Sequence, residues 1–212
     1  MTHIDYTLYL VTDRSGMSAK SLEQAVEQAI QGGCTVVQLR EKYASSREFF
    51  ETAQRVKQIT DSYHIPLIIN DRTDICLAVN AAGIHIGQQD LPAKIVRSMV
   101  GPDKIIGVSA ATLSEAIQAE QDGADYLGVG AMFATSTKTN TRPVTIERLT
   151  QIKQAVQIPV VAIGGIQSSN VTTLTDTGID GIAVVSAILA QENITHAAEQ
   201  LKACFTGAGH EV

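Results

Sequence analysis

Tryptophan is absent from this 212-residue chain, and aromatic residues of all kinds make up only 4% of it. Basic residues are also in the minority, because 16 lysines and arginines stand against 22 aspartates and glutamates and leave a formal net charge of −6. Proteins that bind nucleic acid generally carry a basic excess. We therefore expect no nucleic-acid partner, and we expect a local cluster of cations wherever an anionic ligand binds.

Cysteine is scarce as well. Cys34, Cys76 and Cys204 are an odd number without Cys-x-x-Cys spacing, which argues against a disulfide framework and a Cys-rich zinc site. Apolar runs stay below the roughly 18 residues that a membrane span needs. Residues 1–13 also lack the basic segment of a secretory signal. These absences predict a cytoplasmic protein without a membrane partner.

Hydrophobic residues make up 44% of the chain and recur in short runs rich in Val, Ile and Leu, separated by stretches with helical periodicity. This alternation is typical of parallel strands with crossover helices. Strands are expected at 8–11, 36–39, 67–69, 83–86, 105–108, 126–129, 160–163 and 182–185. Helices are expected at 22–30, 47–62, 75–79, 93–99, 113–121, 146–155, 171–176, 187–189 and 194–205. Eight such units favour an α/β protein with one (βα)8 TIM barrel as a single domain over 1–212, because an open sheet would leave two edges to protect.

Polar residues follow most of the predicted strands, and in (βα)8 barrels the catalytic groups lie at these carboxyl ends. Gln38, Arg40 and Lys42 follow the second strand at alternate positions. If the extended conformation continues there, their side chains point the same way and bring two cations to the mouth of an acidic protein. Solvated surface cations are the alternative interpretation.

Two carboxylates follow neighbouring strands, Asp71 after the third and Asp90 after the fourth. Mg²⁺ commonly takes one or two protein carboxylates and fills its shell with water and phosphate oxygens, so this pair is a candidate magnesium site. The alternatives are a turn role for Asp71 and capping of the following helix by Asp90. For His85, within the fourth strand, we expect a structural role, and no His-Glu-x-x-His motif indicates metal hydrolysis.

Barrels commonly bind phosphate after the seventh and eighth strands, through backbone N–H groups and a helix N-terminus. Gly164 and Gly165 follow the seventh strand, and Val185 and Ser186 stand at the end of the eighth. We expect these four residues to bind phosphate. A tight turn at the glycines and an N-cap role for Ser186 are the alternatives.

The loop at 131–143, after the sixth strand, is long and carries four threonines, a serine and Lys138. This composition is suited to a lid that closes over an anion. A polar surface loop is the alternative.

Seven short motifs occur in order on these strand ends: YLVTD at 9–13, VQLREK at 37–42, INDR at 69–72, GIHIGQ at 83–88 with Asp90, GVG at 128–130, TSTK at 135–138 and AIGGI at 162–166. Each motif alone has little specificity, but the seven motifs occur in the expected order. Through them the chain resembles the thiamine-phosphate synthase family from its first strand to its last. The family often has proline where Ala131 and Ala134 stand here. We therefore expect a looser lid with unchanged chemistry.

The resemblance implies that the enzyme joins 4-amino-5-hydroxymethyl-2-methylpyrimidine diphosphate to 4-methyl-5-(2-phosphooxyethyl)thiazole. The products are thiamine phosphate and diphosphate, in thiamine biosynthesis, and the enzyme is a Mg²⁺-dependent transferase with Asp71 and Asp90 as metal ligands. The implied pyrimidine diphosphate site consists of Gln38, Leu39, Arg40, Glu41, Lys42, Asn70, Ser109 and Lys138. The implied thiazole phosphate site consists of Thr135, Ser136, Thr137, Gly165, Val185 and Ser186.

The resemblance also implies a dissociative displacement, in which diphosphate departs before the thiazole nitrogen captures a pyrimidine carbocation. Arg40, Lys42, Ser109 and Lys138 are then the catalytic residues. Their three cations, together with Mg²⁺, nearly balance the roughly three negative charges of diphosphate and the two aspartates. No side-chain nucleophile is required.

Three other functions stay open at this point. A thiazole tautomerase on the same barrel would need a general acid or base, and Ser109 is less suited to proton transfer than a histidine. A non-catalytic sensor of thiamine phosphate is the second, and a sugar-phosphate epimerase or an aldolase is the third. In each case we expect small-molecule partners, and a homo-oligomer is compatible with the sequence.

Overall fold

Eight parallel strands close into a barrel in the computed structural model, which describes residues 4–19, 21–135 and 142–207. Each strand pairs with the next in chain order, and β8 pairs with β1. The strands are β1 Leu8–Val11, β2 Val36–Leu39, β3 Leu67–Asn70, β4 Gly83–Ile86, β5 Ile105–Ala110, β6 Tyr126–Val129, β7 Val160–Ile163 and β8 Gly181–Val184. The predicted (βα)8 barrel is confirmed, whereas its extent as one domain over 1–212 stays a prediction.

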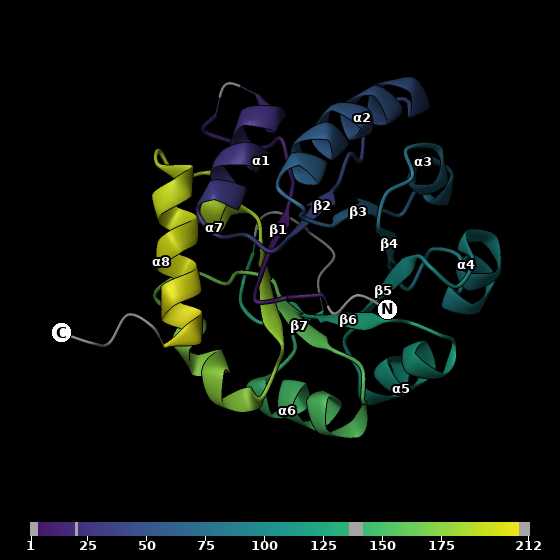
Figure 1. Ribbon diagram of the computed structural model, residues 1–212. Helices are drawn as coiled ribbons and strands as arrows, with labels where there is room; N and C mark the ends of the chain where they lie inside the picture. The colour runs from purple at the N-terminus through teal and green to yellow at the C-terminus, as the bar shows by residue number, and fades with distance from the viewer. Residues whose placement is uncertain (1–3, 20, 136–141, 208–212) are drawn as a thin grey trace.

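Helices surround the barrel on the outside, as Figure 1 shows. They are α1 Leu22–Gln31, α2 Ser46–Ser62, α3 Thr73–Ala78, α4 Ala93–Val100, α5 Leu113–Gln121, α6 Ile146–Ala155, η1 Val171–Thr177, α7 Ser186–Leu189 and α8 Ile194–Thr206. None of the helices in the described ranges combines the length and apolar character that crossing a membrane requires.

Side-chain caps explain where several helices begin. Ser45 accepts a hydrogen bond from the backbone N–H of Glu48, and the Glu48 carboxylate accepts one from the Ser45 N–H, so the two form a capping box before α2. The hydroxyls of Ser21, Thr112 and Thr145 cap α1, α5 and α6, each by accepting one backbone hydrogen bond. These short polar residues satisfy N–H groups that a first helical turn leaves unpaired.

Several helices and strands differ from the predicted bounds by one or two residues, and the differences at the seventh crossover and at β8 have a cause in the backbone. The seventh crossover is a 3-10 helix, in which Val171, Leu174 and Thr177 are buried at intervals of three residues, the repeat of that helix. β8 ends at Val184, one residue earlier than predicted. Val185 has φ −120° and ψ −87°, which is not an extended conformation. It therefore belongs to the turn that leads into α7.

Alternating strand residues build two separate cores. Leu8 and Leu10 belong to the large apolar layer between the barrel and its helices. Tyr9 and Val11 belong to a smaller cluster with side chains from β2, β3, β6, β7 and β8, which fills the barrel interior. Three tyrosines of this interior cluster lie together, since the Tyr6 and Tyr126 ring centroids are 4.8 Å apart and those of Tyr9 and Tyr126 are 5.9 Å apart.

Candidate active site

Arg40 is held at the mouth of the barrel by residues that follow β1. Its backbone N–H donates to the Thr12 hydroxyl at 3.0 Å, and its guanidinium donates to Oδ2 of Asp13 at 2.6 Å. Asp13 also accepts hydrogen bonds from the backbone N–H and the hydroxyl of Ser15. Asp13 has no predicted role, although its place in the polar segment that follows β1 is a usable signal. This carboxylate offsets part of the positive charge expected at the mouth.

Lys42 contacts the carboxyl end of the strand on the other side of β2, which is β3. Its Nζ lies 2.6 Å from Oδ2 of Asp71, which follows β3. Gln38 instead lies inside the barrel, where its Nε2 donates to the Tyr9 hydroxyl at 2.9 Å. The three alternate residues of β2 and its loop therefore do not point toward one position. They contact β1 and β3 on either side of β2, because the extended strand ends at Leu39.

Asp71 and Asp90 lie near each other at the ends of β3 and β4. Asp71 adopts a left-handed conformation with φ 62°, and its N–H donates to the carbonyl of His85 at 2.9 Å. Oδ2 of Asp90 accepts the Gly87 N–H at 2.7 Å. Asp90 does not cap α4, whose N-cap is Pro92 without a side-chain hydrogen bond. Partial burial of its carboxyl group and the charge of Asp71 both raise the pKa of Asp90, against the opposing Gly87 N–H.

This pair of carboxylates fits Mg²⁺ in the chemistry of its donors, because Mg²⁺ accepts two protein carboxylates and leaves positions for water and phosphate oxygens. Within residues 4–19, 21–135 and 142–207, no group of three or more His, Cys, Asp or Glu side chains could enclose a metal ion. A metal here would therefore depend on substrate oxygens to complete its shell.

Three predicted pyrimidine-site residues have constrained side chains. Leu39 is fully buried in the layer between barrel and helices, so only its backbone can reach a ligand. The Glu41 carboxylate accepts a hydrogen bond from Arg14 at 2.7 Å, and Asn70 is the half-buried last residue of β3. Ligand binding by these residues stays a prediction.

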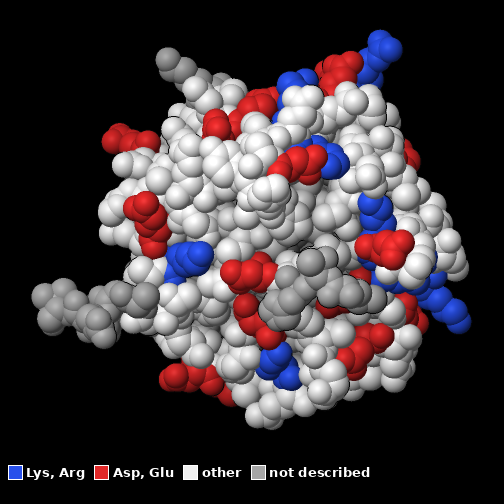
Figure 2. All heavy atoms as spheres, viewed as in Figure 1, with Lys and Arg blue, Asp and Glu red and all other residues white. Residues whose placement is uncertain are grey.

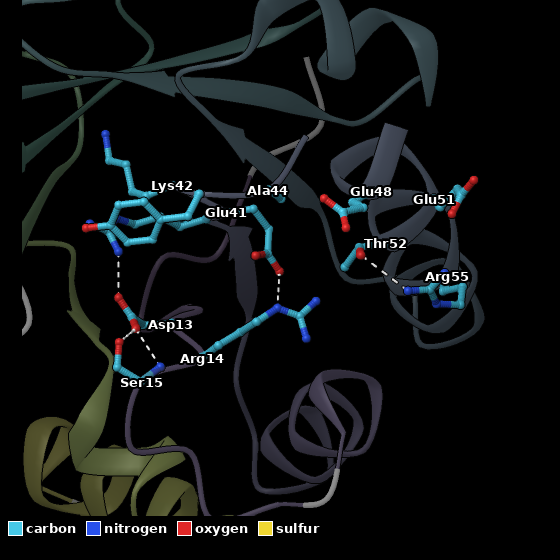
Figure 3. A pocket seen from close by; sticks show the side chains of 12 residues that line it. Asp13, Arg14, Ser15, Glu41, Lys42, Ala44, Glu48, Glu51, Thr52 and Arg55 are labelled. Carbon is cyan, nitrogen blue, oxygen red and sulfur yellow. Dashed lines mark hydrogen bonds and ion pairs between the residues drawn. The ribbon is translucent and has the colours of Figure 1, made fainter. Parts of the chain in front are cut away.

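A cavity of about 520 Å³ opens beside the mouth, between the loops after β1 and β2 and the helix α2. Figure 3 shows the Arg14–Glu41 pair on its wall. Arg40 and Lys42 belong to this wall, but Ser109 does not. On the face seen in Figure 2, basic and acidic side chains are interspersed rather than separated by sign. The cavity is therefore a side pocket that shares two of its four cationic residues, Arg40 and Lys42, with the mouth.

Ser109 lies on β5 and is held by two residues of the β4 unit. Its hydroxyl lies 2.9 Å from Nε2 of His85, and its carbonyl accepts a hydrogen bond from the Gln88 amide at 2.7 Å. Nδ1 of His85 lies 2.9 Å from the Tyr126 hydroxyl. His85 thus points into the barrel interior and contacts Ser109, a predicted catalytic residue. This contact could not be predicted from the sequence.

The predicted phosphate site contains two consecutive glycines with positive φ, 101° at Gly164 and 65° at Gly165. A side chain at Gly164 would place its Cβ 2.6 Å from the Cβ of Ala131, so glycine is required for this close approach. Ser186 is the first residue of α7 rather than its N-cap, which is Val185. The alternative N-cap role of Ser186 is therefore wrong.

The loop after β6 is anchored at both ends. Ala131 accepts from the N–H of Val144 at 2.9 Å and donates to the carbonyl of Arg142 at 3.0 Å. The guanidinium of Arg142 forms two hydrogen bonds to the Glu115 carboxylate, at 2.6 and 2.9 Å. Thr135 lies within the described part of this loop, whereas Ser136, Thr137 and Lys138 lie outside the described residues. Their predicted roles stay predictions.

Known proteins resemble the chain along nearly its whole length. The profile of the thiamine monophosphate synthase family matches residues 8–188. A thiamine-phosphate synthase of Ruminiclostridium cellulolyticum is 61% identical over 202 residues, which cover 95% of this chain and 96% of the relative. One of Clostridium tetani is 58% identical over 203 residues, with 96% and 97% covered. The solved thiamine phosphate pyrophosphorylase of Pyrococcus furiosus superimposes with a TM-score of 0.89 at 38% identity, covering 97% of this chain and 98% of that one.

Proposed function

Because the chain belongs to the thiamine monophosphate synthase family, we propose that the carboxyl end of its barrel is the place where it forms thiamine phosphate. The activity is that of a transferase in thiamine biosynthesis. The pyrimidine methylene carbon loses its diphosphate oxygen and gains a bond to the thiazole nitrogen. The single observation that carries this assignment is the 61% identity to a thiamine-phosphate synthase across 95% of the chain, which favours the synthase over the tautomerase, sensor and aldolase alternatives.

We propose that Asp71 and Asp90 hold Mg²⁺ together with the diphosphate of the pyrimidine substrate. Their proximity supports this role, because partial burial and the charge of Asp71 raise the pKa of Asp90, and a shared cation would stabilise its ionised state. When bound, Mg²⁺ supplies charge neutralisation for the diphosphate as it becomes the leaving group. The Asp71 carboxylate, which now accepts a hydrogen bond from Lys42, would be one of the groups that hold the metal.

Arg40 and Lys42 orient the diphosphate in this proposal. At about 4 Å and an effective dielectric of about 20, each contact between unit charges is on the order of 4 kcal/mol before desolvation is subtracted. The aspartates that now pair with these cations reduce that gain. Such contacts accelerate the reaction because the charge on the leaving oxygen grows as the bond breaks. Lys138 would add a third cation from the loop after β6, and Ser109 would bind the pyrimidine diphosphate from β5.

The thiazole phosphate is assigned to the opposite side of the mouth. Gly165 would present its backbone to the phosphate at the end of β7. Val185 and Ser186 would do so in the turn after β8. Thr135, Ser136 and Thr137 would complete this site from the loop after β6. The two phosphate-bearing substrates would then approach each other across the barrel axis, which holds the reacting carbon and nitrogen together. Closure of the loop would keep water from the carbocation.

A single assay tests the assignment. Purified protein is incubated with both precursors, with and without Mg²⁺, and thiamine phosphate and diphosphate are measured together. We expect equal amounts of both products and none from either precursor alone. Isomerisation of the thiazole substrate without diphosphate release would instead identify a tautomerase. We further propose that the reaction takes place in the cytoplasm and involves small-molecule partners only.

A further inference from the structure

A continuous series of side-chain hydrogen bonds crosses the barrel interior from Gln38 to Ser109. Nε2 of Gln38 lies 2.9 Å from the Tyr9 hydroxyl, which lies 2.7 Å from the Tyr126 hydroxyl. The Tyr126 hydroxyl lies 2.9 Å from Nδ1 of His85, and Nε2 of His85 lies 2.9 Å from Oγ of Ser109. We call these five residues the interior chain. It joins two predicted substrate-binding residues that come from different sides of the barrel.

Two glycines make room for the rings of the interior chain. A Cβ at Gly107 on β5 would overlap the Tyr126 ring, and a Cβ at Gly128 on β6 would lie 2.9 Å from Cε1 of His85. Any larger residue at these positions would displace the rings and break their hydrogen bonds. The barrel wall is therefore shaped around the rings of Tyr126 and His85.

Burial restricts how protons can be arranged along the interior chain. Tyr9 and Tyr126 are 1% and 0% exposed, so their hydroxyl protons must be donated to protein atoms rather than to water. Burial raises the pKa of both tyrosines, which keeps them protonated. Each hydroxyl carries one proton, and neutral histidine carries one proton on its two ring nitrogens. The direction of one hydrogen bond therefore determines the direction of the next.

The Gln38 amide sets that direction from one end. Because its Nε2 donates to Tyr9, the Tyr9 hydroxyl donates to Tyr126, and the Tyr126 hydroxyl donates to Nδ1 of His85. In the neutral form of His85, the single ring proton is then on Nε2 and is donated to Oγ of Ser109. The Ser109 oxygen already accepts a hydrogen bond in this arrangement, so its own proton is directed to another acceptor. The opposite direction would require the Gln38 amide to present its oxygen to Tyr9.

We propose that Tyr9, Tyr126 and His85 are positioning residues that orient the Ser109 hydroxyl as a hydrogen-bond donor to the pyrimidine diphosphate substrate. This inference rests on the proposed function, because it assigns Ser109 to that substrate. It adds three residues that touch no substrate atom and act through Ser109. The expected consequence is tighter binding of an acceptor atom on the pyrimidine diphosphate, since an oriented donor loses less freedom on binding.

A double-mutant cycle between Tyr126 and Ser109 tests the proposal. Tyr126→Phe removes one oxygen and retains the ring, and we expect kcat/KM for the pyrimidine diphosphate to fall about fivefold, the equivalent of one ordinary hydrogen bond. In a Ser109→Ala background the same substitution should change kcat/KM by less than about twofold, because the group on which it acts is gone. Tyr9→Phe, which breaks the series one step earlier, should behave in the same way, and it serves if Tyr126→Phe does not fold.

Tyr6→Phe is the matched control. Tyr6 packs on Tyr126 in the same interior cluster but is not a member of the interior chain, and we expect its substitution to leave kcat/KM unchanged. Equal losses in both Ser109 backgrounds would overturn the inference, because they would indicate a packing role. A loss for Tyr6→Phe as large as that for Tyr126→Phe would also overturn it. If the wild-type protein forms no thiamine phosphate, the proposed function fails and this inference fails with it. If the wild type is active but the cycle shows no coupling between Tyr126 and Ser109, only this inference fails.

Discussion

Nζ of Lys42 and Oδ2 of Asp71 lie 2.6 Å apart, so a cation assigned to the diphosphate is bonded to a carboxylate assigned to the metal. The two side chains come from the ends of neighbouring strands, β2 and β3. Each of them neutralises the other until ligands arrive. Binding of a metal and a diphosphate together would let both charges exchange partners at once, which couples the binding of the two ligands.

Lys42→Met removes the ammonium group that now pairs with Asp71. Without the competing ammonium group, Asp71 should bind Mg²⁺ several-fold more tightly in the substrate-free protein, as measured by calorimetric titration. KM for the pyrimidine diphosphate should rise at the same time by more than about tenfold, since one charged contact is lost. Lys57→Met is the control, because Lys57 pairs with Asp61 on α2. Weaker Mg²⁺ binding by Lys42→Met would contradict the competition.

Asp71→Asn and Asp90→Asn provide the second prediction. Each substitution retains the shape of the side chain but removes the charge that a hard cation requires. Diphosphate release should fall by more than about tenfold in both variants, and excess chelator should abolish it in the wild type. Asp74→Asn is the matched control, since Asp74 pairs with Arg72 at the start of α3. If Asp71→Asn turned over as fast as the wild type, Asp71 would have only a structural role in the turn after β3.

Ser186→Ala should separate the two substrates. Ser186 does not cap α7, so its removal should leave the unfolding temperature close to that of the wild type. KM for the thiazole phosphate should rise several-fold with little change in kcat, because a hydroxyl that binds phosphate does not take part in bond breaking. KM for the pyrimidine diphosphate should stay constant. An unchanged KM for the thiazole phosphate would remove Ser186 from the site.

The anchor of the loop after β6 should contribute stability that depends on pH. Hydrogen bonding by Arg142 lowers the pKa of Glu115. A lowered pKa means that the folded state favours the carboxylate, so the stabilisation is present above the ordinary value of about 4.5 and is lost as the pH falls through the lowered value. Glu115→Gln should therefore lower the free energy of unfolding at pH 7 by up to about 1 kcal/mol.

Urea unfolding at pH 7 and pH 3 measures this difference, which should shrink at the lower pH. Glu51→Gln is the control, because Glu51 is exposed and Nε of its ion-pair partner Arg47 lies 4.0 Å from its carboxylate. A difference of the same size at both values of pH would show that the Glu115 charge is not responsible.

The strands could be predicted from the sequence because buried parallel strands are short and apolar on both faces. Most of them, such as 36–39 and 83–86, have the predicted bounds. Val185 was assigned to β8 because it continues an apolar run, yet its backbone turns toward α7. Composition does not determine where such a turn begins.

The candidate site was predictable only in part, since polar residues at strand ends mark the mouth without fixing their partners. The Asp13–Arg40 pair joins two strand ends. Tyr9 and Tyr126 are 117 residues apart in sequence and bond in the interior. Both contacts depend on the register and closure of the barrel, which periodicity does not specify. In the sequence, nothing distinguishes the two tyrosines from other strand residues.

Metal-dependent formation of thiamine phosphate is tested most directly by measuring diphosphate and thiamine phosphate from the same reaction as a function of Mg²⁺ concentration, in the wild type and in Asp71→Asn. We expect equal amounts of the two products, a saturable dependence on Mg²⁺ in the wild type and a loss of that dependence in the variant. Full product formation by the wild type in excess chelator would contradict this expectation.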